Sequence, residues 1–264
     1  MKFASLIFAF LFIGCAGQPT SKLKSGIVAE EVNYSTETTN LKGYMAYKKG
    51  KKNLPGVIII HEWWGHNEYV RKRAEQLAEL GYFAFAIDMY GEGKNVEHPK
   101  EANEFMMQTM KNMPEAKARI MAAVNTIKEQ NQVDSENLAA IGYCFGGGVV
   151  LQAVQMGVNL KAAVTFHGGL SGVKSFPKNS ETKLLVLNGE DDPMVTSEQI
   201  ANLKKQANNS GVDLTFINYP DAKHAFTNPG ATEKGEKFKL PLAYNAQADK
   251  ESWEEMKKLF NETL

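Results

Sequence analysis

The chain has 264 residues, with 30 basic and 30 acidic side chains and no formal net charge at pH 7. Because this balance leaves no excess positive charge, the composition does not indicate a nucleic-acid partner. The sequence holds no fixed-period repeat and no low-complexity stretch. The roughly 240 residues that follow the N-terminal segment suit one large α/β domain.

The first residues resemble an export signal. The apolar run at residues 3–13 is shorter than the roughly 20 apolar residues that cross a bilayer, and it has the length of a secretory signal. Gly14 precedes Cys15 as at the cleavage site of bacterial lipoproteins. We expect a lipoprotein signal peptide at 1–14, lipid on Cys15, a flexible tether at 15–25, and an exported protein at the periplasmic or cell-surface face of a membrane. An ordinary cleaved signal peptide with an incidental cysteine is the alternative.

Strand and helix patterns alternate through residues 26–264, which we interpret as one domain. Two antiparallel strands are expected within residues 26–48, and apolar, β-branched runs predict further strands at 56–61, 82–88, 138–144, 162–168, 183–189 and 213–220. Helical periodicity predicts helices at 69–80, 99–113, 114–131, 146–156, 200–208 and 252–260. This alternation predicts a doubly wound, mostly parallel sheet with helices on both faces, and functional side chains at the carboxyl ends of its strands.

A glycine-rich turn follows the strand at residues 138–144. The stretch GYCFG (142–146) has the spacing of the G-x-S-x-G nucleophile elbow, with cysteine in place of serine. The start of the following helix favours a thiolate over a thiol. Only two cysteines are present, and if Cys15 carries lipid, Cys144 has no intrachain partner. Cys144 is therefore the candidate nucleophile, and a buried inert cysteine is the alternative.

A base and a carboxylate are needed to activate such a nucleophile, and in this architecture they follow it in the chain as acid, then histidine. His224 lies in the loop after the last predicted strand, and Asp191 and Asp192 follow the strand at 183–189. Asp192 has the G-x-x-D spacing from Gly189 and is preferred to Asp191. A solvated loop histidine and turn-forming carboxylates are the alternatives.

Five motifs carry a resemblance to a known family: HEWWGHN (61–67), DMYGEG (88–93), GYCFGG (142–147), GEDDPMV (189–195) and HAF (224–226). Over about residues 32–260 the chain resembles the dienelactone hydrolase family. The resemblance implies the α/β-hydrolase fold and the hydrolysis of a carboxylic ester or lactone by a triad of Cys144, His224 and Asp192. It also implies an oxyanion hole formed by the backbone N–H groups of Trp63 and Phe145.

The resemblance also implies a role for Glu62, which matches a family glutamate that holds the resting cysteine as a neutral thiol until substrate displaces it. A loop carboxylate in a salt bridge is the alternative. Family members that open dienelactone bind its carboxylate with arginines, whereas the corresponding segments here offer Lys100, Lys111 and Lys234 but no arginine. An ammonium group does not replace a guanidinium fork. We therefore expect an activated ester or lactone other than dienelactone.

The aromatic residues Trp64, Tyr90 and Phe226 lie beside candidate site residues in these motifs, as Trp63 does, and are the candidates to shape an aromatic pocket, although core packing is the favoured role for each alone. The methionines at 106, 107, 110 and 113 are expected to fill the core or to form an adaptable lid. No metal or other cofactor is expected, since HEWWGH is not the zinc motif HExxH. The expected partners are a small-molecule ester and, through the lipid, a membrane, and a monomer is favoured. An acyl transferase or thioesterase with the same triad, or a catalytically silent binding lipoprotein, is the alternative function.

Overall fold

The computed structural model describes residues 25–178 and 180–264. The expected signal peptide and Cys15 lie outside these residues, as does nearly all of the expected tether. Within the described ranges, no helix is both long enough and apolar enough to cross a membrane.

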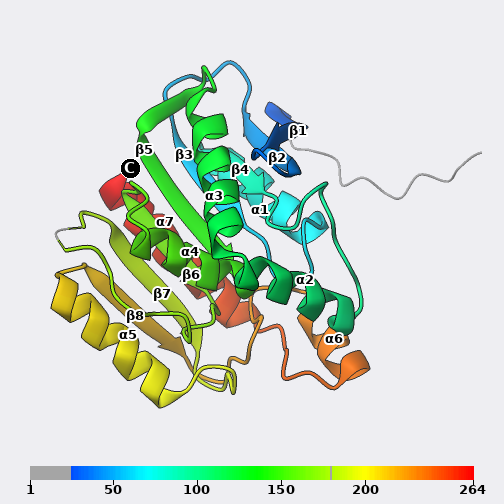
Figure 1. The fold of residues 1–264 in the computed structure, drawn as a ribbon, viewed down its shortest axis with the longest axis vertical. Helices are drawn as coiled ribbons and strands as arrows, with labels where there is room; N and C mark the ends of the chain where they lie inside the picture. Colours follow the sequence, from blue (N-terminus) through cyan, green and yellow to red (C-terminus); the bar gives the residue numbers. More distant parts are fainter. Residues whose placement is uncertain (1–24, 179) are drawn as a thin grey trace, which may run out of the picture.

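An eight-stranded sheet runs through the molecule (Figure 1). Its strands are β1 (Ile27–Ser35), β2 (Asn40–Lys48), β3 (Leu54–Ile60), β4 (Phe83–Ile87), β5 (Val133–Tyr143), β6 (Ala162–Phe166), β7 (Lys183–Gly189) and β8 (Leu214–Tyr219). Their order is β1-β2-β4-β3-β5-β6-β7-β8. Strands β3 to β8 are parallel, and β2 runs antiparallel to both of its neighbours, β1 and β4. The prediction of a mostly parallel sheet is confirmed.

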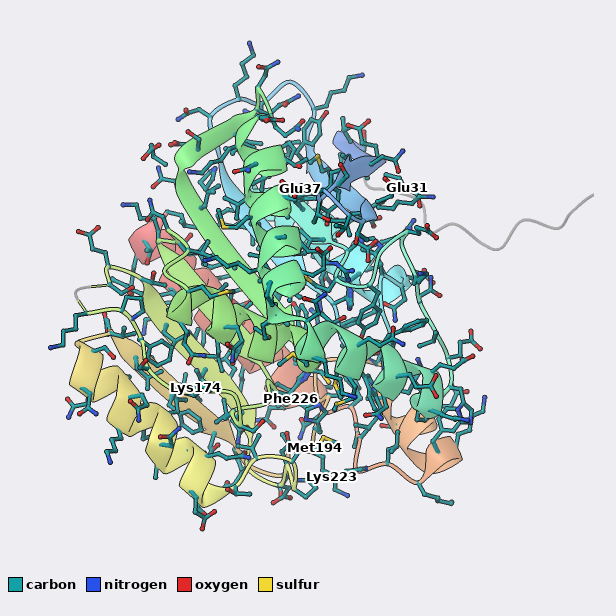
Figure 2. All side chains as sticks on the ribbon, viewed as in Figure 1. Glu31, Glu37, Lys174, Met194, Lys223 and Phe226 are labelled. Atoms are coloured by element: carbon teal, nitrogen blue, oxygen red, sulfur yellow. The ribbon has the colours of Figure 1, made fainter. Side chains whose placement is uncertain are left out.

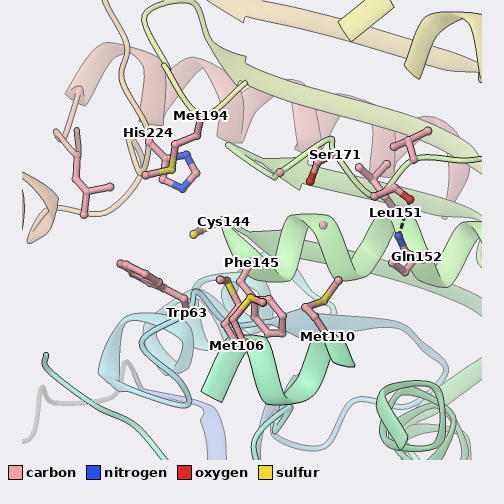
Figure 3. Close-up of a pocket in the computed structure, with 16 residues that line it drawn as sticks. Trp63, Met106, Met110, Cys144, Phe145, Leu151, Gln152, Ser171, Met194 and His224 are labelled. Carbon is pink, nitrogen blue, oxygen red and sulfur yellow. Dashed lines mark hydrogen bonds between the residues drawn. The ribbon is translucent and has the colours of Figure 1, made fainter. Parts of the chain in front are cut away.

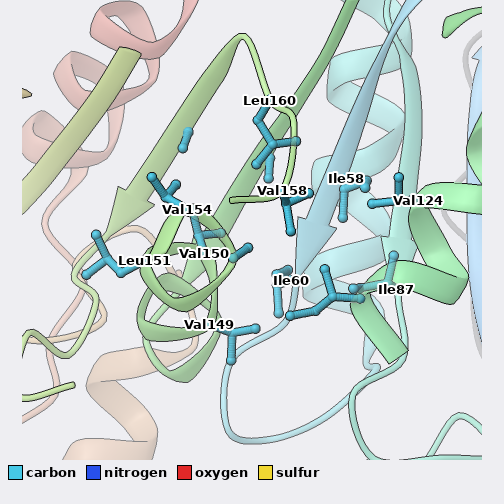
Figure 4. Packing of buried hydrophobic residues seen from close by; sticks show 14 of the residues in the cluster. Ile58, Ile60, Ile87, Val124, Val149, Val150, Leu151, Val154, Val158 and Leu160 are labelled. Atoms are coloured by element: carbon cyan, nitrogen blue, oxygen red, sulfur yellow. The ribbon is translucent and has the colours of Figure 1, made fainter. Parts of the chain in front are cut away.

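Helices cover both faces of this sheet, as predicted. They are α1 (Glu68–Leu80), α2 (Pro99–Lys111), α3 (Met113–Lys128), α4 (Phe145–Gln155), α5 (Ser197–Ser210), α6 (Ala231–Phe238) and α7 (Ala246–Thr263). Because successive strand residues point to opposite faces, Val57 and Ile59 of β3 pack with α1 and α7. Ile58 and Ile60 pack on the other face, in the cluster that contains buried residues of α3, α4 and α5 (Figure 4).

Three helices differ from the prediction. Helix α5 begins earlier than expected because Thr196 and Gln199 form a capping box, and α7 begins earlier because Asn245 caps it. Helix α6 was not predicted. Its sequence lacks an apolar stripe. Gly235 within it packs closely against the backbone at Leu242, since a Cβ on Gly235 would be 2.3 Å from the Leu242 carbonyl oxygen.

Charged side chains project from the outside of the molecule, among them Glu31, Glu37, Lys174 and Lys223 (Figure 2). The carboxyl ends of β3, β5, β6, β7 and β8 lie next to one another in the sheet. Glu62 follows the end of β3, Cys144 that of β5, Asp192 that of β7 and His224 that of β8.

Candidate active site

Cys144 lies at the sharp turn between β5 and α4. Its backbone has φ 55° and ψ −116°, a conformation that non-glycine residues rarely adopt and that marks functional turns. Two glycines make the turn possible: a Cβ on Gly142 would lie 2.2 Å from the Gly146 carbonyl oxygen, and one on Gly146 would lie 2.3 Å from that of Ile60. The turn therefore has the geometry of a nucleophile elbow, with a half-buried thiol at the start of a helix.

His224 and Asp192 form a buried pair. Nδ1 of His224 lies 2.7 Å from Oδ2 of Asp192, while Nε2 is buried without a hydrogen-bond partner among the described residues. Burial opposes the charged ring, but the charge of the nearby Cys144 thiolate and the hydrogen bond to Asp192 outweigh it and raise the pKa of His224 to about 10. Asp191 is not part of this pair.

A cavity of about 500 Å³ opens over Cys144 and His224 (Figure 3). Its other lining residues are Trp63, Met106, Met107, Met110, Phe145, Gly148, Leu151, Gln152, Gly169, Ser171, Gly172, Val173, Met194 and Leu242. In the part of the chain that the structure describes, no Asp, Glu, Lys or Arg side chain lines it. A substrate here would contact the thiol and the imidazole within a largely apolar space.

Two backbone N–H groups lie at this cavity, that of Trp63 in the loop after β3 and that of Phe145 at the start of α4. Phe145 opens α4, so its N–H has no partner within the helix. No hydrogen bond from the N–H of Trp63 is found among the described residues. The Tyr90 hydroxyl donates to the Trp63 carbonyl oxygen at 2.9 Å and so holds this loop from behind.

Glu62 is buried beside the site, and burial raises its pKa, although a hydrogen bond from Asn228 and the charge of His224 act in the opposite direction. Its Oε2 accepts this hydrogen bond from Nδ2 of Asn228 at 2.6 Å. No hydrogen bond to Cys144 is found within the described ranges. The hydrogen bond found for the Glu62 side chain is thus the one from Asn228, and the resting-state role that the resemblance implies for Glu62 stays a prediction.

His167 connects the elbow to the loop that carries His224. The Cys144 backbone N–H donates to Nδ1 of His167 at 3.1 Å, so the ring proton lies on Nε2, which faces Oγ1 of Thr227 at 2.7 Å. Thr227 Oγ1 lies 2.6 Å from the Tyr69 hydroxyl. All of these contacts are buried or nearly so, and burial holds the pKa of His167 well below its usual value. Sequence reasoning assigned no role to His167, Thr227 or Asn228.

The three aromatic residues expected in the pocket do not line it. Trp64 is buried next to Ala102 and Leu242, Tyr90 lies behind the Trp63 loop, and Phe226 packs against His167 with a ring separation of 5.2 Å. This is a correction to the sequence prediction. The loops turn these side chains inward to support the site, and Trp63 is the aromatic residue that they turn toward the cavity. Of the four methionines considered, those at 106, 107 and 110 line the cavity.

The remaining histidines of the first motif support loops. Nδ1 of His61 faces the Glu62 carbonyl oxygen at 2.6 Å, and its Nε2 accepts from the Met89 N–H. Nε2 of His66 faces the Ala86 carbonyl oxygen at 3.0 Å. Over residues 25–178 and 180–264, no group of three or more His, Cys, Asp or Glu side chains is arranged to hold a metal ion.

Comparison with known proteins relates this chain to one family. Residues 41–264 match the dienelactone hydrolase family. A dienelactone hydrolase-like promiscuous phosphotriesterase from metagenomic libraries is 32% identical, with a TM-score of 0.85 over 90% of this chain and 99% of the other. Protein usf of Aquifex pyrophilus is 28% identical over 76% of this chain and 88% of its own length. A candidate carboxymethylenebutenolidase of Methylorubrum extorquens is 26% identical over 76% of this chain and 73% of its own length. The chain therefore belongs to the dienelactone hydrolase family, a family of ester hydrolases with the α/β-hydrolase fold.

Proposed function

We propose that the chain hydrolyses an activated carboxylic ester or lactone with Cys144 as nucleophile, His224 as acid and base, and Asp192 as the group that orients the histidine. The observation that carries the proposal is the cavity shared by Cys144 and His224, with Asp192 bonded to the far nitrogen of the ring. This is the spatial relation that nucleophilic catalysis requires.

The proposed reaction has two steps. The Cys144 thiolate attacks the acyl carbon, and the oxyanion accepts hydrogen bonds from the N–H groups of Trp63 and Phe145. The carbon–oxygen bond to the leaving group breaks, and His224 gives that oxygen a proton, which leaves a thioester on the sulfur. Water then loses a proton to His224 and attacks the thioester, which releases the acid and restores the thiolate.

Cysteine limits the substrates that such a site turns over well. A thiolate leaves a tetrahedral intermediate more readily than an alkoxide does. An intermediate whose alcohol is a poor leaving group therefore expels the thiolate and returns to the starting ester. We therefore expect aryl esters, enol esters and lactones to react, and simple alkyl esters and amides to react slowly. Glu62, beside His224 and held by Asn228, would contribute negative charge near the ring when it is ionised.

The test uses p-nitrophenyl acetate with the purified full-length protein. We expect hydrolysis by the wild type, a loss of at least about a hundredfold in kcat/KM for Cys144→Ala, and an acetyl group on Cys144 in acid-quenched samples by mass spectrometry. Cys15→Ala is the matched control, because it replaces the other cysteine of the chain, and it should keep the activity. Equal rates for wild type and Cys144→Ala would refute the proposal, whereas acyl transfer to an added alcohol in preference to water would favour the transferase alternative.

We also propose export and membrane anchoring through a lipid on Cys15. The support is the N-terminal sequence alone: a short apolar run that ends in Gly14-Cys15. Bacteria that express the protein should incorporate an alkyne fatty acid into it, and Cys15→Ala should abolish that labelling. Labelling that persists in Cys15→Ala would exclude this anchor.

Phosphotriester hydrolysis is a second candidate. The relative with 32% identity is described as a promiscuous phosphotriesterase, and a cavity without charged side chains suits a neutral triester. Release of p-nitrophenol from paraoxon by the wild type and not by Cys144→Ala would support it. If the wild type releases no p-nitrophenol from paraoxon, the carboxylic ester remains the proposed substrate.

A further inference from the structure

One wall of the cavity is a single face of α4. Gly148, Leu151 and Gln152 line it, and they follow Cys144 by four, seven and eight residues, which places them on one side of a helix. At about 1.5 Å per residue, the stretch from Cys144 to Gln152 is about 12 Å long. The cavity therefore extends well beyond the reacting sulfur in one direction, as Figure 3 shows.

The opposite wall is apolar. Met106 and Met110 of α2 face this stretch (Figure 3), and Val173 also lines the cavity. Methionine side chains adapt their shape to a flexible ligand. Gln152 donates to the Gly172 carbonyl oxygen at 2.8 Å, so part of its amide is already used within the protein.

The mouth of the cavity is apolar as well. Met107 and Met194 are both 42% exposed, and both line the cavity. Together with Leu80 they are the large hydrophobic side chains found exposed among the described residues. Their position on two sides of one opening indicates a surface that receives an apolar ligand.

The catalytic groups fix which part of an ester lies along α4. In the proposed reaction His224 protonates the leaving oxygen, so the leaving group lies on the side of His224, where Met194 and Leu242 also line the cavity. The acyl group then extends the other way, from Cys144 toward Leu151 (Figure 3). A carboxylate on that acyl group would meet no cation and would lose its hydration.

We propose that the substrate is an ester with a neutral, extended, apolar acyl chain that lies along α4 between Cys144 and Leu151, opposite Met106 and Met110. This rests on the proposed function and names its substrate class. An acyl chain that ends in a carboxylate would bind poorly in the cavity, because no cation among the described residues lines these walls.

Esters with one leaving group test the proposal. We compare p-nitrophenyl acetate, p-nitrophenyl octanoate and the mono-p-nitrophenyl ester of suberic acid, which is the octanoate chain with a terminal carboxylate. Each buried methylene contributes up to about fourfold, so kcat/KM for octanoate should exceed that for acetate at least tenfold. It should exceed that for the suberate ester at least about thirtyfold, since the carboxylate would lose its hydration and meet no cation among the described residues that line the cavity.

A positive charge placed in the wall should weaken the preference for octanoate over the suberate ester. Met110→Lys should lower kcat/KM for octanoate and raise it for the suberate ester, so that their ratio falls at least about tenfold. Gln108→Lys adds the same charge to α2 at a position that does not line the cavity, and its ratio should equal that of the wild type. Circular dichroism shows whether both variants are folded, and the wild-type series tests the proposal even if Met110→Lys is not.

The same measurements distinguish failure of the acyl-chain proposal from failure of the proposed esterase function. Cys144-dependent hydrolysis of acetate without a preference for octanoate would overturn the acyl-chain proposal and keep the esterase. If no ester is hydrolysed, calorimetry with octanamide and with suberic acid monoamide replaces the kinetics. Binding of the neutral amide at least tenfold tighter than of the anion would support the proposal, and equal binding or none would overturn it.

Discussion

Thr227 offers a direct test of the buried network behind the nucleophile. Its side chain is fully buried, and its hydroxyl bonds both His167 and the Tyr69 hydroxyl. Thr227→Val keeps the shape of the side chain and removes both bonds. Because Nδ1 of His167 accepts from the Cys144 N–H, the ring carries its proton on Nε2. In Thr227→Val this Nε2–H group has lost the hydroxyl that accepts from it.

The expected cost follows from those two contacts. A buried polar group left without its partner costs about 1–3 kcal/mol, so the two together should lower the free energy of unfolding by about 2–6 kcal/mol. For a protein of this size, each kcal/mol shifts Tm by about 2–4 °C, so Tm should fall by about 4–24 °C. We expect kcat to fall by about tenfold with little change in KM, since misplaced catalytic groups slow the chemical step.

Scanning calorimetry and p-nitrophenyl acetate kinetics provide the two measurements. Thr227→Ser is the matched control, because it keeps the hydroxyl and removes one methyl group, for a loss of about 1 kcal/mol. A Val variant as stable as the Ser variant would refute the reasoning, because it would mean that the hydroxyl is not what holds His167.

Two further predictions concern the reacting pair and the elbow. The pKa of His224 should fall when Cys144→Ala removes the adjacent negative charge, as followed by NMR titration of the ring; an unchanged pKa would contradict this origin of the shift. Because the folded pKa of about 10 exceeds the ordinary 6.5, the stabilising contribution of His224 should be complete below pH 6.5 and lost as the pH rises through 10. Gly146→Ala should destabilise the fold by at least about 3 kcal/mol, since its Cβ would meet the Ile60 carbonyl oxygen at 2.3 Å. Gly169→Ala, where a Cβ meets nothing within 4 Å, should change stability little; equal stability of the two alanine variants in urea would contradict this explanation.

The parallel strands were predictable because each is a short apolar run bounded by turn residues. Strands β3, β4, β6 and β7 and the C-terminal half of β5 are buried on both faces or nearly so, and such strands give a continuous signal in the sequence. Helix α6 gave no comparable signal. Its course depends on the close approach of Gly235 to Leu242, which is a tertiary contact rather than a local pattern.

The same distinction applies to the candidate site. Cys144, Asp192 and His224 follow strand ends, and parallel strands bring their carboxyl ends to one edge, so their proximity could be expected from spacing. The directions in which the side chains of Trp64, Tyr90 and Phe226 point could not be expected from the sequence. Each sits next to a motif residue, but adjacent residues in a loop point different ways, and only the folded loops decide which of them reaches the cavity.

The short segment from His224 to Asn228 shows how tightly the parts of the site depend on one another. His224 bonds Asp192 after β7, Thr227 bonds His167 after β6, and Asn228 bonds Glu62 after β3. Three side chains of one loop therefore hold the carboxyl ends of three parallel strands, and His167 passes the contact on to the backbone of the nucleophile. Since these bonds are buried, a shift of the loop would disturb the base, the acid and the elbow together. In the proposed reaction this loop thus positions the reacting groups, whereas the apolar walls that we propose to select the acyl chain come from α2 and α4. A change in the proposed acyl-chain selectivity would therefore not require a change in the proposed catalytic groups.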